Sequence, residues 1–225
     1  MHQVIRQPEK DRLLQGLLQT LSNRGIAGGW AKSPEPFSKL LRECHVLISD
    51  PACEETFRTY LQANPIIQQT VETLLAHYAM ASSVEWQDVP ALLQPLARRG
   101  WHIGRWVPTF LIIDGPLGRF LKAPDSPLNA LLRREYAKYP TLAQARDIFN
   151  NDLFRQVRNG VGHWSFLWKD GATGPSLVMV DWKSGKTTAT ITLLEAEALH
   201  LVGFSVIEAL DQEVFSRVNP RGSGG

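Results

Sequence analysis

The sequence has only two cysteines, Cys44 and Cys53, which lie nine residues apart and form no Cys-x-x-Cys pattern. A single pair at this spacing provides neither a structural zinc site nor a disulfide framework. We therefore expect two buried, free thiols and a fold that depends on its hydrophobic core.

Long apolar runs are also missing. The longest candidate, residues 107–113, contains Pro108 and stops at Asp114, far short of the roughly 18 residues that cross a bilayer. The first 12 residues are polar and charged, without the apolar stretch of a secretory signal. We expect a protein of the cytoplasm that does not bind membranes.

Several catalytic signatures are absent from the sequence. It contains no His-Glu-x-x-His motif, no cysteine–histidine cluster and no carboxylate group with ligand spacing, so we expect no metal and no cofactor. It also lacks Gly-x-Ser-x-Gly and the phosphate-binding loop, which argues against a serine hydrolase or a P-loop nucleotidase.

The chain has enough apolar residues to build a core. Of its 225 residues, 44% are hydrophobic and 20% are charged, which is typical of a globular domain. We predict a single helical domain over residues 1–219, with N-terminal helices of unknown role in 1–95 and a core in 96–219, followed by a flexible tail at 220–225.

Apolar periodicity predicts mostly helices. Helical stripes occur in residues 13–21, 37–48, 66–78, 128–139, 142–157 and 199–215. We expect Pro140 to end one helix and Thr141 to cap the next, and Thr192 with Glu195 to form a capping box. Two apolar runs around the turn at 183–186 predict a β-hairpin. The predicted fold class is all-α: a helical bundle with a small two-stranded β-hairpin before the C-terminal helix.

The positive charge is unevenly distributed. Residues 96–169 contain twelve Lys and Arg against five Asp and Glu, a balance of +7, which leaves −5 for the remainder of a chain whose net charge is +2. Such a segment could bind a polyanion, and solvated helix faces explain it equally well. For the basic and aromatic cluster at 98–106 we favour packing over binding to RNA.

The most informative segment follows the helix predicted at 142–157. It reads Arg158-Asn159-Gly160-Val161-Gly162-His163-Trp164. On an unbroken helix, Arg158 and His163 would point about 140° apart. Because Gly160 and Gly162 tolerate a tight turn, we expect the helix to loosen there and to swing His163 back towards Arg158.

This Arg-Asn-x-x-x-His segment resembles the Arg-x(4–6)-His motif of the HEPN superfamily, helical-bundle proteins of which many are ribonucleases. The polar residue directly after the arginine, here Asn159, is also typical of that family, and so are a small hairpin and a closing helix after the motif. The resemblance covers about the last 90 to 120 residues, and the N-terminal helices match no family that we can name.

The resemblance implies a metal-independent endoribonuclease. His163 would act as the acid or base, Arg158 would stabilise the charge that grows on the phosphate, and Asn159 would orient them. Arg155, Trp164 and Lys169 are candidates for substrate binding, although solvated charge, and for Trp164 burial, are the alternatives. Because one motif offers one imidazole, we expect a homodimer or a pair with a second such domain.

The sequence is compatible with three functions. The first is an RNA-cutting toxin or antiviral defence effector, which an antitoxin or another regulatory protein would restrain. The second is a non-catalytic module of the same fold that binds RNA or a protein partner, with residues 158–163 serving only as a helix C-cap. The third is a helical adaptor without any link to RNA. We assign no role to the other histidines: His2, His45, His77, His102 and His200.

Overall fold

The computed structural model describes residues 15–16, 19, 22–23, 36–83, 126–163, 165–171 and 174–218. Within these, five helices begin on a proline, whose fixed φ and missing N–H suit the first turn of a helix. They are α2 (Pro36–Ser49), α3 (Pro51–Ala63), α4 (Pro65–Ser83), α8 (Pro127–Arg134) and α9 (Pro140–Asn150).

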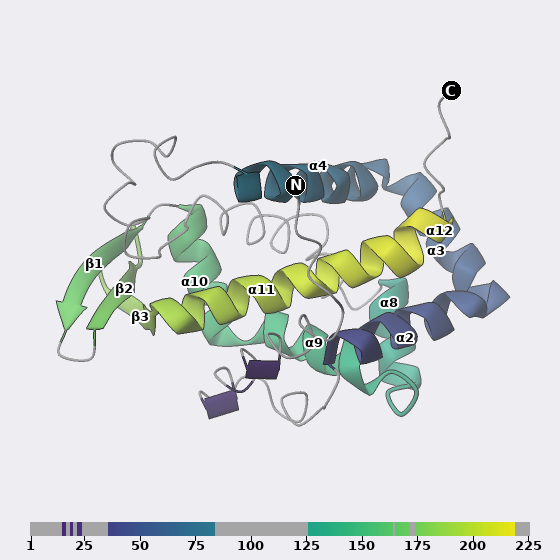
Figure 1. The fold of residues 1–225 in the computed structure, drawn as a ribbon, viewed down its shortest axis with the longest axis horizontal. Helices are drawn as coiled ribbons and strands as arrows, with labels where there is room; N and C mark the ends of the chain where they lie inside the picture. Colours follow the sequence, from purple (N-terminus) through teal and green to yellow (C-terminus); the bar gives the residue numbers. More distant parts are fainter. Residues whose placement is uncertain are drawn as a thin grey trace.

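The remaining helices that we describe lie in the C-terminal part of the chain. Helix α10 (Asp152–Gly162) follows α9 after a single residue. Helix α11 (Leu193–Leu210), the π-helical turn η3 (Asp211–Phe215) and the short α12 (Ser216–Val218) then continue without interruption. Figure 1 shows α11 running through the middle of the molecule, with the sheet at one of its ends and α12 at the other.

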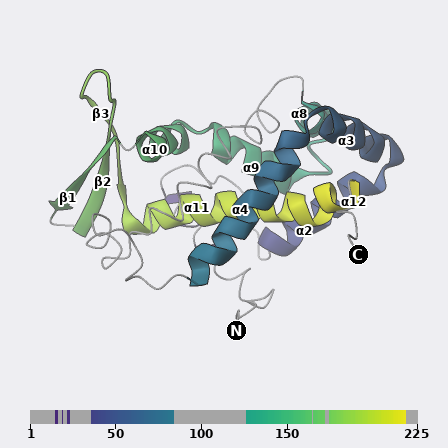
Figure 2. The same cartoon turned by 90° about the horizontal axis from the view of Figure 1, so that it is seen from above.

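Three antiparallel strands pack at the N-terminal end of α11. They are β1 (Phe166–Gly171), β2 (Gly174–Val180) and β3 (Thr187–Thr192), in the order β1-β2-β3. The turn between β2 and β3 includes Gly185 at φ 68°, a left-handed conformation that glycine adopts without steric cost. Figure 2 shows the sheet standing at one end of the helices.

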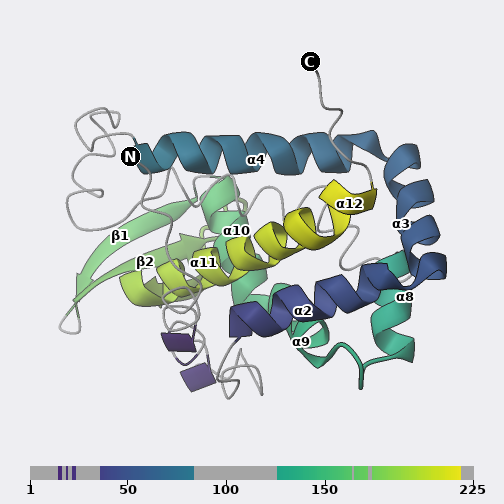
Figure 3. The same cartoon turned by 45° about the vertical axis from the view of Figure 1, so that its right-hand side comes forward.

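The hydrophobic core is built around α11. Most of its described apolar side chains are buried, as expected for a central helix, and the helix contacts α2, α9, β2 and β3. The large side chains that are almost fully buried come from several elements: Phe37, Phe57, Phe149, Phe154 and Phe215. In Figure 3, α3 links α2 to α4 at the end of the molecule far from the sheet.

The predicted fold class is confirmed, because the described chain is predominantly helical with one small sheet. The capping box is also confirmed: Thr192 Oγ1 accepts from the N–H of Glu195, and the Glu195 carboxylate accepts from the N–H of Thr192. Both cysteines are buried and free, as predicted. Burial raises the pKa of both thiols above the ordinary range.

Four local predictions were wrong. The helix expected at 128–139 ends at Arg134, and the helix expected at 142–157 is divided into α9 and α10. Thr141 does not cap α9; the cap is the buried carboxylate of Glu43 on α2, which accepts from the N–H groups of Thr141 and Leu142 at 3.0 and 2.8 Å. Helix α3 and strand β1 were not predicted, so the two-stranded hairpin is part of a three-stranded sheet.

Several predictions concern residues outside those that the structure describes. Most of the helix predicted at 13–21 belongs to this group, although residues 15–16, 19 and 22–23 are helical. The basic and aromatic cluster at 98–106 and the tail at 220–225 also lie outside the described residues. Nothing in the fold tests the single-domain prediction.

Candidate active face on helix α10

Helix α10 is a short amphipathic helix held at both ends. At its start, the Asn151 side chain accepts a hydrogen bond of 2.9 Å from the N–H of Leu153, as N-caps do. Phe154, Val157 and Val161 are buried, and Phe154 meets Phe149 of α9 edge to face with ring centroids 5.3 Å apart. The opposite side of α10 is therefore the one exposed to solvent.

The expectation that the two glycines loosen this helix was wrong. Helix α10 continues through Gly162, and the N–H of His163 still donates to the carbonyl of Asn159 at 3.0 Å. Gly160 is needed for packing instead. A Cβ built on it would meet the Met179 side chain of β2, with Cγ at 3.1 Å and Cβ at 3.2 Å. The glycine thus allows α10 to approach the sheet closely.

Because the helix is unbroken, Arg158 and His163 project about 140° apart around its axis. The structure does not turn one back towards the other within the chain. Asn159 and His163, in contrast, are four residues apart and therefore lie on one stripe of the helix. Both are exposed.

Hydrogen bonds to Asn159 hold the Arg158 side chain beside that stripe. Its Nη2 and Nε donate to Asn159 Oδ1 at 3.0 and 3.3 Å, and the side chain is half-buried. The structure therefore brings Arg158 and Asn159 together directly and places His163 one turn beyond them. We call the exposed stripe of Asp152, Arg155, Asn159 and His163, with Arg158 along its side, the α10 polar face.

Arg155 on this face is already paired. Its Nη2 donates to Asp152 Oδ1 at 2.8 Å, and both side chains are more than half exposed, at 58% and 76%. An ion pair as exposed as this contributes little to stability, so a phosphate could compete for the guanidinium. Lys169 lies apart from the helix, exposed on strand β1. Trp164 is outside the described residues.

The C-terminal end of α10 is fixed to the sheet by two backbone hydrogen bonds. The N–H of Ser165 donates to the carbonyl of Gly160 at 2.9 Å, and the carbonyl of Ser165 accepts from the N–H of Val180 at 2.9 Å. These bonds and the Gly160–Met179 contact set the position of His163 relative to β2.

Many of the cations of the basic segment are neutralised locally. Arg134 and Lys138 both pair with Glu135, and Arg146 pairs with Asp147. These side chains fit the alternative of solvated helix faces. Arg98, Arg99 and Arg105, which would decide whether the segment forms a polyanion surface, lie outside the described residues.

The side chains of two of the remaining histidines are described. His45 is exposed, and its Nδ1 lies 3.4 Å from the Glu213 carboxylate, whereas His200 is buried beside Phe204. Within the described part of the chain, no three His, Cys, Asp or Glu side chains gather in a way that could hold a metal ion. In that same part, no helix combines the length and the apolar character that a membrane span requires.

Sequence reasoning missed one exposed residue of interest. Trp182 lies in the β2–β3 turn, two residues after the end of β2, and its side chain is 67% exposed. Its position beside Lys183-Ser184-Gly185-Lys186 was the available signal, because an aromatic residue next to a turn often lies at the surface.

Comparisons with known proteins find no match to this chain among protein-family models, curated proteins or solved structures.

Proposed function

We propose that this protein is a metal-independent endoribonuclease of the HEPN type, with the α10 polar face as its active centre. One observation carries the proposal: an exposed helix face presents a guanidinium held by an amide oxygen, with an imidazole one turn further along.

The chemistry follows from the groups themselves. An imidazole can take the proton of a ribose 2′-hydroxyl or give one to the leaving 5′-oxygen, and His163 supplies one on the exposed side of α10. The Arg158 guanidinium stays charged and can form two parallel hydrogen bonds to phosphate oxygens. Asn159 cannot transfer protons, and its bond to Arg158 assigns it to orienting that guanidinium. The products would end in a 2′,3′-cyclic phosphate.

A dimer completes such a site. Within one chain the two groups point about 140° apart, and one imidazole has to serve two proton transfers. Two α10 polar faces that meet across a two-fold axis would supply a second imidazole and a second guanidinium to one cleft. We therefore propose a homodimer with a composite site, or a pair with a second HEPN-like domain.

The biological setting is part of the proposal. An enzyme that cuts RNA in the cytoplasm must be restrained in the cell, which fits a toxin or a defence effector held by an antitoxin or a regulatory protein.

The test is incubation of labelled RNA with the purified protein in excess chelator, alongside Arg158→Ala and His163→Ala. We expect cutting by the natural protein and a loss of at least about 100-fold in both variants. An RNA with one 2′-deoxyribose should resist at that position, because the nucleophile is gone. Equal cutting by all three proteins would mean a contaminating nuclease.

The alternative is a non-catalytic HEPN-like module that binds RNA or a protein partner. It is favoured by the position of His163 as the C-cap of α10, where its backbone N–H ends the helix. On this alternative, the natural protein binds RNA without cutting it, and His163→Ala binds equally well.

A further inference from the structure

The sheet has an outer face that the core does not use. Leu177, Met179 and Ile191 are buried against the helices. Side chains alternate along a strand, so the residues between them point away from the core. Leu167, Val178 and Thr190 are register partners across the three strands on this outer side, and the Leu167 side chain is 62% exposed. We call these three positions, together with Trp182, the outer sheet face.

An indole extends this face at the β2–β3 turn. Trp182 is 67% exposed, and core packing does not explain so large an exposed aromatic side chain. Lys183 Nζ lies 5.1 Å from the centroid of its ring, at cation–π distance. Lys186 is exposed in the same turn, and Lys169 is exposed on β1 opposite Ser176, towards the other end of β2. An aromatic ring flanked by cations is the combination that single-stranded nucleic acids bind.

The turn that carries Trp182 is well defined. Asp181 Oδ1 accepts from the N–H groups of Lys183 and Ser184 at 3.2 and 2.7 Å and from Ser184 Oγ at 2.8 Å. This carboxylate is the one acid among the described side chains of residues 166–192, and it is engaged within the turn. Among the described side chains of this turn, Lys183 and Lys186 are therefore the charges that it offers to a ligand.

The sheet that carries the outer sheet face is tied to the proposed active centre, although α10 packs on the opposite, inward side of the sheet through Met179. Strand β1 begins at Phe166, three residues after His163, and the two bonds of Ser165 tie β2 to the end of α10. Figures 1 and 2 show α10 standing beside the sheet. A strand of RNA on the sheet would therefore be held at a fixed place relative to the α10 polar face.

We propose that the outer sheet face is a platform for single-stranded RNA, on which a base stacks on Trp182 while Lys183, Lys186 and Lys169 contact phosphates. This inference rests on the proposed function for its choice of RNA, and it adds where the substrate is held and that it is single-stranded. The bases of a duplex are already stacked on one another and are not available to the indole.

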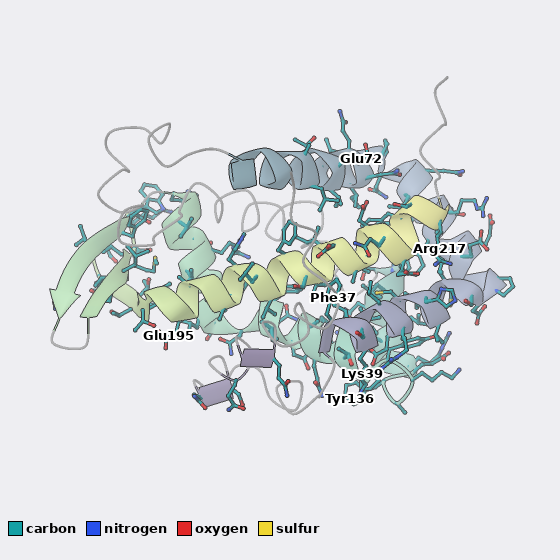
Figure 4. All side chains as sticks on the ribbon, viewed as in Figure 1. Phe37, Lys39, Glu72, Tyr136, Glu195 and Arg217 are labelled. Atoms are coloured by element: carbon teal, nitrogen blue, oxygen red, sulfur yellow. The ribbon has the colours of Figure 1, made fainter. Side chains whose placement is uncertain are left out.

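The probe is a fluorescein-labelled single-stranded RNA of about 12 nucleotides, 2′-O-methylated throughout so that it cannot be cut. Its fluorescence anisotropy is measured with the full chain, with Trp182→Ala and with Lys183→Ala/Lys186→Ala. The matched control is Tyr136→Ala, an aromatic residue 48% exposed that Figure 4 places at the end of the molecule away from the sheet.

We expect Trp182→Ala to weaken binding about 5- to 100-fold, with Tyr136→Ala within about two-fold of the natural protein. The double lysine variant should make the dependence of log K on log salt shallower by about 1.4, because two phosphate contacts are lost. A duplex of the same length should bind more weakly than the single strand.

Absence of binding by the natural protein, or equal binding by Trp182→Ala, would overturn the platform. So would a change of sedimentation in Trp182→Ala with RNA binding intact, because the face would then be a protein interface. The probe cannot be cut, so the two proposals fail separately. If Trp182→Ala loses binding and the natural protein does not cut RNA, the platform is supported and the nuclease proposal is contradicted. If the natural protein cuts RNA and Trp182→Ala binds the probe equally well, the nuclease is supported and the platform is contradicted.

Discussion

Gly160 shows how a single residue sets the distance between two elements. The sequence motif suggested that the glycines of residues 158–163 give the chain freedom, but Gly160 is helical and buried. What distinguishes it from alanine is one methyl group directed at Met179. No property of the local sequence reveals that contact, because Met179 belongs to another element.

Gly160→Ala should therefore destabilise the protein. Alanine favours helix by about 0.5–1 kcal/mol, but overpacking against Met179 costs about 1–3 kcal/mol, so we expect a net loss of up to about 2.5 kcal/mol in urea unfolding. Met179→Ala removes the obstruction. In the double variant the two effects should be less than additive, and strict additivity would show that the methyl group and Met179 do not meet.

The buried thiol of Cys44 should make the folded protein less stable at alkaline pH. Burial, and then the carboxylates of Glu43 and Glu213, raise the pKa of this thiol above its ordinary value. A raised pKa in the folded state means that the native protein keeps a proton that the unfolded chain releases. The stability due to the protonated thiol is thus complete below the unfolded pKa of about 8.5 and falls as the pH rises above it.

We expect the free energy of unfolding to fall above that pH, with up to about 1.4 kcal/mol per pH unit due to Cys44. The measurement is the urea midpoint between about pH 8 and pH 10. Cys44→Ala is the control that isolates the thiol from lysine and tyrosine titration. Its stability should decline less steeply, and parallel curves for the two proteins would contradict the prediction.

At the scale of elements, α9 and α10 hold the candidate site, and α9 depends on a distant cap. The Glu43 carboxylate from α2 accepts from two N–H groups at the start of α9, where an anion also favours the helix dipole. The sequence suggested Thr141 because N-caps are usually adjacent in the chain. A cap supplied from about one hundred residues away in sequence leaves no local pattern.

Glu43→Ala should lower the free energy of unfolding by about 1–3 kcal/mol, because two buried N–H groups lose their acceptor. The midpoint of urea unfolding measures the loss. Glu55→Ala on α3, whose side chain is 73% exposed, is the matched control and should change stability by less than about 0.5 kcal/mol. Equal effects of the two substitutions would contradict the capping role.

The sequence predicted the elements whose signals are local and failed where they are not. The α11 capping box and the β2–β3 turn are encoded within a few residues, and both are present. Pro140 was read as the end of a helix although it begins α9, because proline suits both places. Strand β1 was not predicted, although it precedes β2 along the chain and pairs with it, with Gly171 opposite Gly174.

At the scale of the whole molecule, the proposed active centre depends on the proposed dimer, because α10 is unbroken. The residues of the site could be named from the sequence, but their directions could not, because these depend on whether the helix breaks. Because the Arg158 and His163 positions lie about 140° apart around α10, with the Arg158 guanidinium held beside Asn159, we propose that the guanidinium and the imidazole of one cleft come from different protomers.

This expectation is testable by mixing variants. Homodimers of Arg158→Ala lack both Arg158 guanidinium groups, and those of His163→Ala lack both His163 imidazoles. After subunit exchange, the mixed dimer has one Arg158 and one His163 in different protomers, and we expect it to recover part of the RNA cutting, because it holds one of the two imidazoles of the proposed cleft. Sedimentation should show dimers for all samples. Dimers that exchange subunits without recovering activity would place the working pair within one chain.

The central claim is that the α10 polar face cuts RNA through its 2′-hydroxyl. The most direct test is the chemical identity of the new 3′ ends when one defined RNA is incubated with the natural protein in excess chelator and with His163→Ala. We predict 2′,3′-cyclic phosphate ends, or the monophosphates formed from them, with the natural protein and none with the variant. New 3′-hydroxyl ends, or the same cyclic ends with His163→Ala, would contradict the account.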